Sequence, residues 1–282
     1  MAQKKMIQDF SERKQKNEKI TFVTAYDFPT AQFAETAGLD MILVGDSLGM
    51  CVYGYSGTIP VTMEQMIVHA EAVRRGAPRT FVIGDMPFMS YQSSVEKAVE
   101  NAGRFLKEAG CDAIKLEGGQ RVVPQIRAIV EAGIVVMGHI GLTPQSSGQL
   151  GGHRAQGRTA EAARQVVEDA LAVQAAGAHL ILLEAVPPEV GRFITRKLAI
   201  PALSIGAGLD CDGQLLIVSD LIGQFQAFTP KFVKKYANVA EIIIQAFREY
   251  VREVKEGAFP AEEHCYRMVE GEEEKFLELM AR

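Results

Sequence analysis

Three short apolar runs of this chain are each followed by a carboxylate. They are residues 41–44, followed by Asp46 and Ser47, residues 81–84, followed by Asp85, and residues 113–116, followed by Glu117. Such runs are typical of buried strands, so each acidic group is expected where a strand ends. Oxygen ligands from several chain segments are what a hard divalent cation binds. A metal site is therefore the simplest interpretation of the pattern.

Three further groups lie where other strands are expected to end, Asp27, His139 and Glu184, and Lys115 lies within the run 113–116 itself. Lys115 and Glu117 are two residues apart, and side chains at that spacing point to the same face of a strand. Glu184 follows four consecutive apolar residues, where a carboxylate is costly to bury unless it is paired or used. Metal-assisted removal of a proton from a 2-oxo acid would use such a set, with a buried carboxylate as the base.

Each group also has a purely structural interpretation. Asp46 and Asp85 could cap helices or hold turns. Lys115 could pair with Glu117 and do nothing else, and His139 could be an ordinary core histidine. The recurrence of the same design at three runs favours function, because three separate caps would not require it.

The chain alternates strand patterns with helix patterns. The predicted strands are residues 20–26, 41–44, 80–83, 113–116, 134–137, 179–183, 202–205 and 215–218, and the predicted helices between them are 30–37, 61–75, 93–109, 124–132, 159–176 and 187–198. About eight such units predict an α/β protein with a (β/α)8 barrel, with a doubly wound open sheet as the alternative. We expect one domain over residues 1–282, with an N-terminal arm at 1–19 and C-terminal helices within 230–282, at 233–255 and 261–280.

The interval of residues 143–158 breaks this pattern. It is rich in glycine, serine and glutamine and has hardly an apolar anchor. A loop of this length inside a compact domain is usually a lid or a disordered insert. We therefore expect one of these two beside the site.

The composition excludes several classes of protein. The 282 residues are 48% hydrophobic and 23% charged, which is enough for a substantial core, and the net charge of −5 argues against a nucleic-acid surface. No apolar run reaches the roughly 18 residues needed to span a bilayer, and the N-terminus lacks the apolar stretch of a signal peptide. The four scattered cysteines predict reduced thiols in a cytoplasmic protein.

Seven motifs, in order, resemble the 3-methyl-2-oxobutanoate (ketopantoate) hydroxymethyltransferase family. They are VGDSLGM, TIPVT, GDMPF, AIKLEGG, MGHIGLTPQ, LLEAVP and SIGAG. The resemblance runs from about residue 21 to about residue 228. It implies a barrel of the phosphoenolpyruvate/pyruvate type.

The resemblance also implies an activity and a set of roles. Members move a hydroxymethyl group from 5,10-methylenetetrahydrofolate onto 3-methyl-2-oxobutanoate, with Mg²⁺, to make 2-dehydropantoate for pantothenate and coenzyme A synthesis. By match, the metal residues are Asp46, Asp85 and Glu117, the substrate residues are Asp46, Ser47, Asp85, Lys115 and His139, and the catalytic base is Glu184. The family further implies small-molecule substrates and a cytoplasmic homo-oligomer, often a decamer.

Two other interpretations remain open. The first is a Mg²⁺-dependent lyase or mutase of the isocitrate lyase and phosphoenolpyruvate mutase type. Isocitrate lyase has a catalytic cysteine on a loop after the fourth strand, and residues 118–125, which follow Glu117 here, contain no cysteine. The second is a barrel kept for assembly alone, which would be expected to lose its acidic residues.

Overall fold

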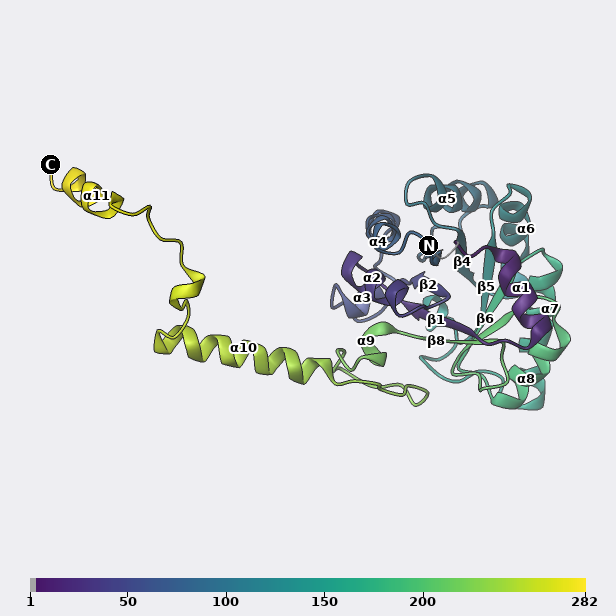
Figure 1. Ribbon diagram of the computed structural model, residues 1–282. Helices are drawn as coiled ribbons and strands as arrows, with labels where there is room; N and C mark the ends of the chain where they lie inside the picture. Colours follow the sequence, from purple (N-terminus) through teal and green to yellow (C-terminus); the bar gives the residue numbers. More distant parts are fainter. Residues whose placement is uncertain (1–3) are drawn as a thin grey trace. The chain divides into compact units, whose positions relative to one another are not determined.

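Eight parallel strands close into a barrel in the computed structural model, which describes residues 4–282 (Figure 1). The strands are β1 Ile20–Thr24, β2 Met41–Val44, β3 Phe81–Asp85, β4 Ala113–Glu117, β5 Val136–Gly141, β6 Leu180–Glu184, β7 Ala202–Ile205 and β8 Gly213–Leu216. Each strand pairs with its neighbour in sequence, and β8 pairs with β1. The (β/α)8 prediction is confirmed, and the open sheet is excluded.

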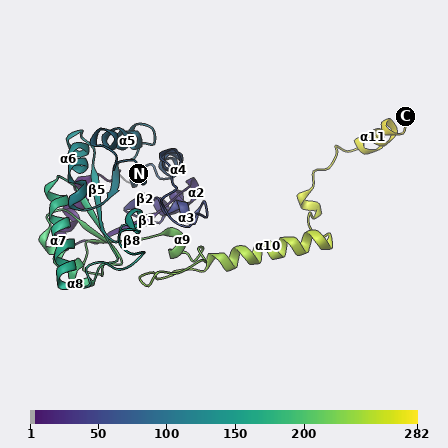
Figure 2. The ribbon, with the colours of Figure 1, turned by 180° about the vertical axis from the view of Figure 1, so that it is seen from behind.

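Helices surround the strands on the outside of the barrel (Figures 1 and 2). As far as Tyr236, the helices are α1 Ile7–Lys16, α2 Phe28–Thr36, α3 Leu48–Cys51, α4 Met63–Gly76, α5 Val95–Lys107, α6 Val123–Glu131, α7 Ala160–Ala175, α8 Pro188–Lys197 and α9 Val218–Leu221. Two 3-10 turns lie among them, η1 Gln120–Val122 and η2 Pro144–Ser146. Side-chain caps begin four of the helices, α2, α4, α5 and α7, because Asp27, Thr62, Ser94 and Thr159 each accept a hydrogen bond from a backbone N–H of the first turn.

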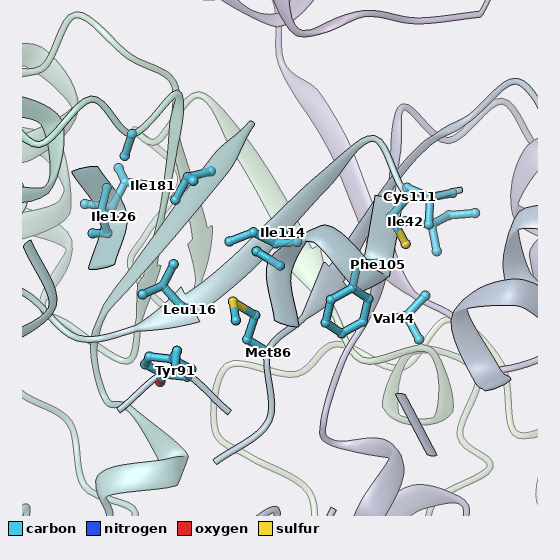
Figure 3. Packing of buried hydrophobic residues seen from close by; sticks show 14 of the residues in the cluster. Ile42, Val44, Met86, Tyr91, Phe105, Cys111, Ile114, Leu116, Ile126 and Ile181 are labelled. Carbon is cyan, nitrogen blue, oxygen red and sulfur yellow. The ribbon is translucent and has the colours of Figure 1, made fainter. Parts of the chain in front are cut away.

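The strands separate two apolar layers, as a period of two requires. One face, with Leu43, Ile83 and Leu182, fills the barrel interior. The other face packs against the helices, and Figure 3 shows Ile42 and Ile114 among the side chains of this outer layer.

Two strand glycines allow helices to approach closely. A Cβ on Gly84 would lie 2.2 Å from the ring of Phe105 in α5, and one on Gly138 would lie 2.4 Å from Val173 in α7. Gly84 immediately precedes Asp85, so α5 packs directly behind the end of β3. The backbone that presents Asp85 is therefore supported from outside.

The predicted N-terminal arm is the helix α1 in its described part; residues 1–3 lie outside the described residues. Phe10 is fully buried, and its ring packs edge-on against Phe81 at 5.1 Å between centroids. Phe81 begins β3 and belongs to the barrel-interior cluster. The arm therefore covers the N-terminal end of the barrel, opposite the predicted site.

The structure corrects several predicted boundaries. The eighth strand, expected at 215–218 or slightly later, spans Gly213–Leu216, because Val218 already begins α9. Strand β5 continues to Gly141, so His139 lies within a strand rather than after one. The helix predicted over 233–255 begins only at Val239, because the N–H of Tyr236 bonds to the carbonyl of Leu221, the last residue of α9, and not to a carbonyl of its own turn. The helix predicted over 261–280 is wrong as one element, since Gly271, at a φ of +81°, separates a 3-10 turn from a later helix.

By its internal contacts the chain divides into two units, Met1–Tyr236 and Ala237–Arg282. The second unit contains α10 Val239–Glu256, η3 Glu262–His264 and α11 Glu272–Met280. All the predicted site residues belong to the first unit. Among residues 4–282 there is no helix both long enough and apolar enough to span a bilayer.

Candidate active site

The C-terminal ends of the strands surround a cavity of about 620 Å³. The predicted site residues that line it are Asp46, Ser47, Asp85, Lys115, Glu117, His139 and Glu184. They come from β3, β4, β5 and β6 and from the turn after β2. Asp27 is the exception, because it is exposed and its side chain caps α2 by accepting the N–H of Thr30 at 2.8 Å.

Lys115 is the buried cation of this cluster. Its Nζ lies 2.8 Å from Asp85 Oδ1, 3.9 Å from Glu117 Oε1 and 3.3 Å from His139 Nδ1. Burial alone would lower the pKa of Lys115, but the nearby carboxylates outweigh burial and raise it. The lysine is therefore charged, and it shares the inner face of β4 with Glu117 as its spacing predicted.

Three carboxylates face this one lysine. Asp46 donates its backbone N–H to Asp85 Oδ2 at 3.0 Å, so the two acidic residues lie side by side. Burial raises the pKa of Asp46, Asp85 and Glu117, and repulsion from Glu117 adds to this at the two aspartates. The cluster thus has more negative than positive charge when its carboxyl groups ionise.

Gln145 connects these carboxylates, and sequence reasoning missed it. Its backbone N–H bonds to Glu117 Oε2 at 3.0 Å, and its Nε2 donates to Asp46 Oδ2 and to the carbonyl of Met86, both at 2.9 Å. Its Oε1 accepts the hydroxyl of Tyr91 at 2.7 Å. The interval expected to be a lid or a disordered insert therefore begins with a buried part of the site.

His139 links Lys115 to Glu184. Its Nε2 lies 3.2 Å from Glu184 Oε2, and its Nδ1 faces Lys115. Burial and the charge of Lys115 lower the pKa of His139, which keeps the ring neutral. A neutral ring that accepts at Nδ1 carries its proton on Nε2, toward Glu184.

Glu184 ends β6 at the wall of the cavity, with 15% of its side chain exposed. The next residue, Ala185, has a φ of +47°, a conformation that costs a non-glycine residue free energy and that clusters at functional sites. Its carbonyl accepts the N–H of Gln156, from the glycine-rich interval, at 2.9 Å. The chain therefore turns sharply as it presents this carboxylate.

Ser47 is held by a tyrosine that the sequence did not single out. The hydroxyls of Ser47 and Tyr26 share a hydrogen bond of 2.8 Å, and Thr24 donates to the Tyr26 oxygen at 3.0 Å. Burial raises the pKa of Tyr26 well above its ordinary value, so its hydroxyl keeps its proton. Thr24, the last residue of β1, and Tyr26, just after it, therefore hold the Ser47 hydroxyl in place beside Asp46.

The donor set fits a divalent cation by charge. Within residues 4–282, no three His, Cys, Asp or Glu side chains are already gathered around one point as a metal site. Mg²⁺ does not need such a group, because it is commonly held by one or two carboxylates together with water and substrate oxygens. Asp46 and Asp85, adjacent and buried, supply two carboxylates, and Glu117 adds charge beside them.

Comparisons with known proteins match one family over nearly the whole chain. A sequence model of ketopantoate hydroxymethyltransferase matches residues 4–262. A 3-methyl-2-oxobutanoate hydroxymethyltransferase of Alkaliphilus metalliredigens (strain QYMF) is 65% identical over 274 residues, which cover 97% of this chain and 97% of the relative. One of Moorella thermoacetica is 56% identical over 254 residues, covering 90% of this chain and 94% of the relative.

Solved structures share the barrel. A phosphonopyruvate hydrolase in complex with oxalate and Mg²⁺ superposes with a TM-score of 0.60 at 16% identity, covering 98% of both chains. A 2,3-dimethylmalate lyase, a member of the phosphoenolpyruvate mutase/isocitrate lyase superfamily, gives 0.58 at 18% identity, covering 98% of this chain and 99% of that one. Similarity at these identities shows the fold alone.

Proposed function

The chain belongs to the ketopantoate hydroxymethyltransferase family, and we propose that it transfers a hydroxymethyl group from 5,10-methylenetetrahydrofolate to 3-methyl-2-oxobutanoate. The product is 2-dehydropantoate, a precursor of pantothenate and coenzyme A. The observation that supports this most strongly is the buried carboxylate pair Asp46 and Asp85 with Glu184 in the same cavity. An acidic cluster and a separate carboxylate base are what deprotonation of a 2-oxo acid requires.

Asp46 and Asp85 would hold Mg²⁺, with Glu117 beside it. When bound, the ion acts as a Lewis acid toward the oxo acid. Lys115 supplies positive charge for the anionic substrate, and Ser47 and His139 supply polar contacts at the cavity wall. These groups orient the substrate carbon C3 toward the wall formed by β6.

Glu184 would take the proton from C3, which leaves that carbon nucleophilic. His139 Nε2 lies 3.2 Å from Glu184 Oε2, so a proton on this nitrogen would help to position the carboxylate. The new C–C bond joins C3 to the one-carbon unit. Overall the reaction consumes one water, which supplies the hydroxyl oxygen, and releases tetrahydrofolate.

An activity assay separates this proposal from its rivals. The chain is incubated with Mg²⁺, 3-methyl-2-oxobutanoate and 5,10-methylenetetrahydrofolate, and 2-dehydropantoate is measured by mass spectrometry. Parallel reactions contain phosphonopyruvate or 2,3-dimethylmalate instead. Formation of 2-dehydropantoate that requires the folate supports the proposal. Turnover of only the other two substrates would replace it with a lyase or hydrolase.

The proposal includes a homo-oligomer in the cytoplasm, a decamer by the family resemblance. In α10, Ile244, Phe247, Val251 and Val254 recur at helical spacing and form an apolar stripe. A stripe of this kind is buried against another surface in stable proteins. Sedimentation equilibrium of the full chain tests the assembly, and a mass equal to one chain would contradict it.

A further inference from the structure

The cavity has a second region with a different chemistry. Its wall includes Asp220 and the rings of Phe225, Phe228 and Phe232, all from the segment that follows β8. The same segment also contributes Pro230 and Lys231, so this region combines aromatic rings with one carboxylate and one lysine, whereas the region near Lys115 is ionic. The function proposed for the ionic cluster leaves these four residues without a task.

Asp220 is a buried residue whose carboxylate has no partner in the part of the chain that the structure describes. The residue is 5% exposed, and among residues 4–282 its carboxylate makes no hydrogen bond and no ion pair. Burial raises its pKa, and only the charge of Lys235 opposes this. A carboxylate that faces a cavity without a protein donor is free to accept hydrogen bonds from a ligand.

Three aromatic rings line the same cavity as this carboxylate. Phe225 and Phe228 pack edge-to-face at 5.5 Å between centroids. Phe232 lies against Gly206, where a Cβ would come within 2.6 Å of the ring. The aromatic walls favour a flat, apolar-faced ligand, and the carboxylate, which accepts hydrogen bonds but donates none when ionised, favours a ligand edge with N–H donors.

We propose that this region binds the pteridine ring of the one-carbon donor and that Asp220 accepts hydrogen bonds from its 2-amino group and its N3–H. The inference rests on the proposed function and deepens it. A 2-amino-4-oxopyrimidine presents two adjacent donors that match one carboxylate in a paired geometry. The anionic oxo acid would be repelled by Asp220 and is drawn instead to Lys115.

The size and continuity of the cavity support separate positions for the oxo acid, near Lys115, and for the pteridine, near Asp220. Cavities that enclose ligands of drug size have volumes of about 300–1,000 Å³. The volume of about 620 Å³ lies in that range and is shared by both regions. A pteridine held at Asp220 therefore lies in the same enclosed space as Glu184, where the one-carbon unit is needed.

Direct binding tests the inference without turnover. Calorimetric titration of tetrahydrofolate into wild-type protein is compared with titration into Asp220→Asn, and Asp210→Asn serves as control because Asp210 is a half-exposed surface carboxylate paired with Arg192. We expect Asp220→Asn to weaken binding by about 10- to 100-fold, the range expected when a hydrogen bond to a charged group is lost. The control should bind as the wild type does.

Two fragments of tetrahydrofolate test which part of the ligand Asp220 binds. 6-Methyltetrahydropterin retains the proposed donors, whereas p-aminobenzoylglutamate lacks the pteridine. The substitution should weaken binding of the first and leave binding of the second unchanged. Equal losses for both would mean that the variant damages the cavity in general, and this would overturn the inference.

Thermal unfolding gives a readout that a structural role would move in the opposite direction. If Asp220 serves a ligand, Asp220→Asn removes an unpaired buried charge and raises the Tm of the ligand-free protein. A lower Tm with unchanged tetrahydrofolate affinity would overturn the inference alone. Wild-type protein that binds no tetrahydrofolate would overturn the proposed function as well.

Discussion

At the scale of single residues, one lysine and three carboxylates define the chemistry of the barrel mouth. Lys115 contacts Asp85 and approaches Glu117, and all three side chains are buried. Their positions could be predicted because a carboxylate directly after a buried apolar run is costly unless it is paired or used. Gln145 could not, since a glutamine in a polar loop gives no sign in the sequence that it is buried.

Glu184→Gln should separate binding from proton removal. The amide retains the shape of the side chain but cannot accept a proton, so we expect kcat to fall by about 10²–10⁴-fold with little change in KM for the oxo acid. Steady-state kinetics measure both constants. Glu189→Gln, an exposed change in α8, is the matched control. A kcat equal to that of the wild type would remove Glu184 from the role of base.

Gln145→Leu should impair the site through its neighbours. The change removes the side-chain donor to Asp46 Oδ2 and one of the hydrogen-bond partners of the Tyr91 hydroxyl. Loss of a residue that orients a metal ligand typically costs about 10- to 100-fold in metal affinity or activity. Mg²⁺ titration by calorimetry measures the affinity directly.

Gln149→Leu is the control from the same loop, because Gln149 is exposed and its side chain accepts a hydrogen bond from Arg121, away from the carboxylate cluster. If Gln145→Leu and Gln149→Leu bind Mg²⁺ equally well, Gln145 does not position Asp46.

At the scale of elements, the alternation of strands and helices was predictable because each strand is a short apolar run and several helices begin at a capping residue. The elements after β8 were less predictable. The stretch before Val239 has helix-forming residues, but a backbone bond from Tyr236 to Leu221 holds it outside the helix. Such tertiary contacts override local preference, and no sequence window contains them.

The contact between α1 and the barrel gives a prediction about pH. The Asp40 carboxylate accepts the backbone N–H of Thr21 at 2.8 Å and pairs with Lys5 and Arg13. Burial alone would raise the pKa of Asp40, but these partners outweigh burial and lower it below its ordinary value of 3.8. Asp40→Asn should therefore reduce the free energy of unfolding by about 1.5–3 kcal/mol at neutral pH.

The sign of the pH dependence follows from this depressed pKa. The stabilisation by Asp40 is fully present above pH 3.8 and is lost as the pH falls through the lower folded-state pKa. Urea unfolding should show the wild-type advantage shrinking in that acidic range. Glu12→Gln, which breaks an exposed pair with Lys16, is the control and should change little. An advantage that stays constant into acid would contradict the assignment.

At the scale of the whole molecule, the excess of buried negative charge at the barrel mouth predicts that Mg²⁺ stabilises the folded chain. Mg²⁺ that binds only the folded chain raises the free energy of unfolding by about 2.7 kcal/mol at about a hundredfold excess over its Kd. Differential scanning calorimetry should show a higher Tm with Mg²⁺ and its reversal by EDTA. Asp85→Ala should abolish most of this shift, and Asp210→Asn should retain it. A normal shift in Asp85→Ala would mean that Asp85 is not a metal ligand.

The most direct test of the account is hydrogen–deuterium exchange at C3 of 3-methyl-2-oxobutanoate in D₂O, followed by NMR. The wild-type protein is used with Mg²⁺, with Mg²⁺ and EDTA, and again after addition of tetrahydrofolate. We predict exchange that depends on Mg²⁺ and that Glu184→Gln slows strongly. Absence of exchange with the metal, both with and without tetrahydrofolate, would contradict the proposed deprotonation and the hydroxymethyl transfer that depends on it.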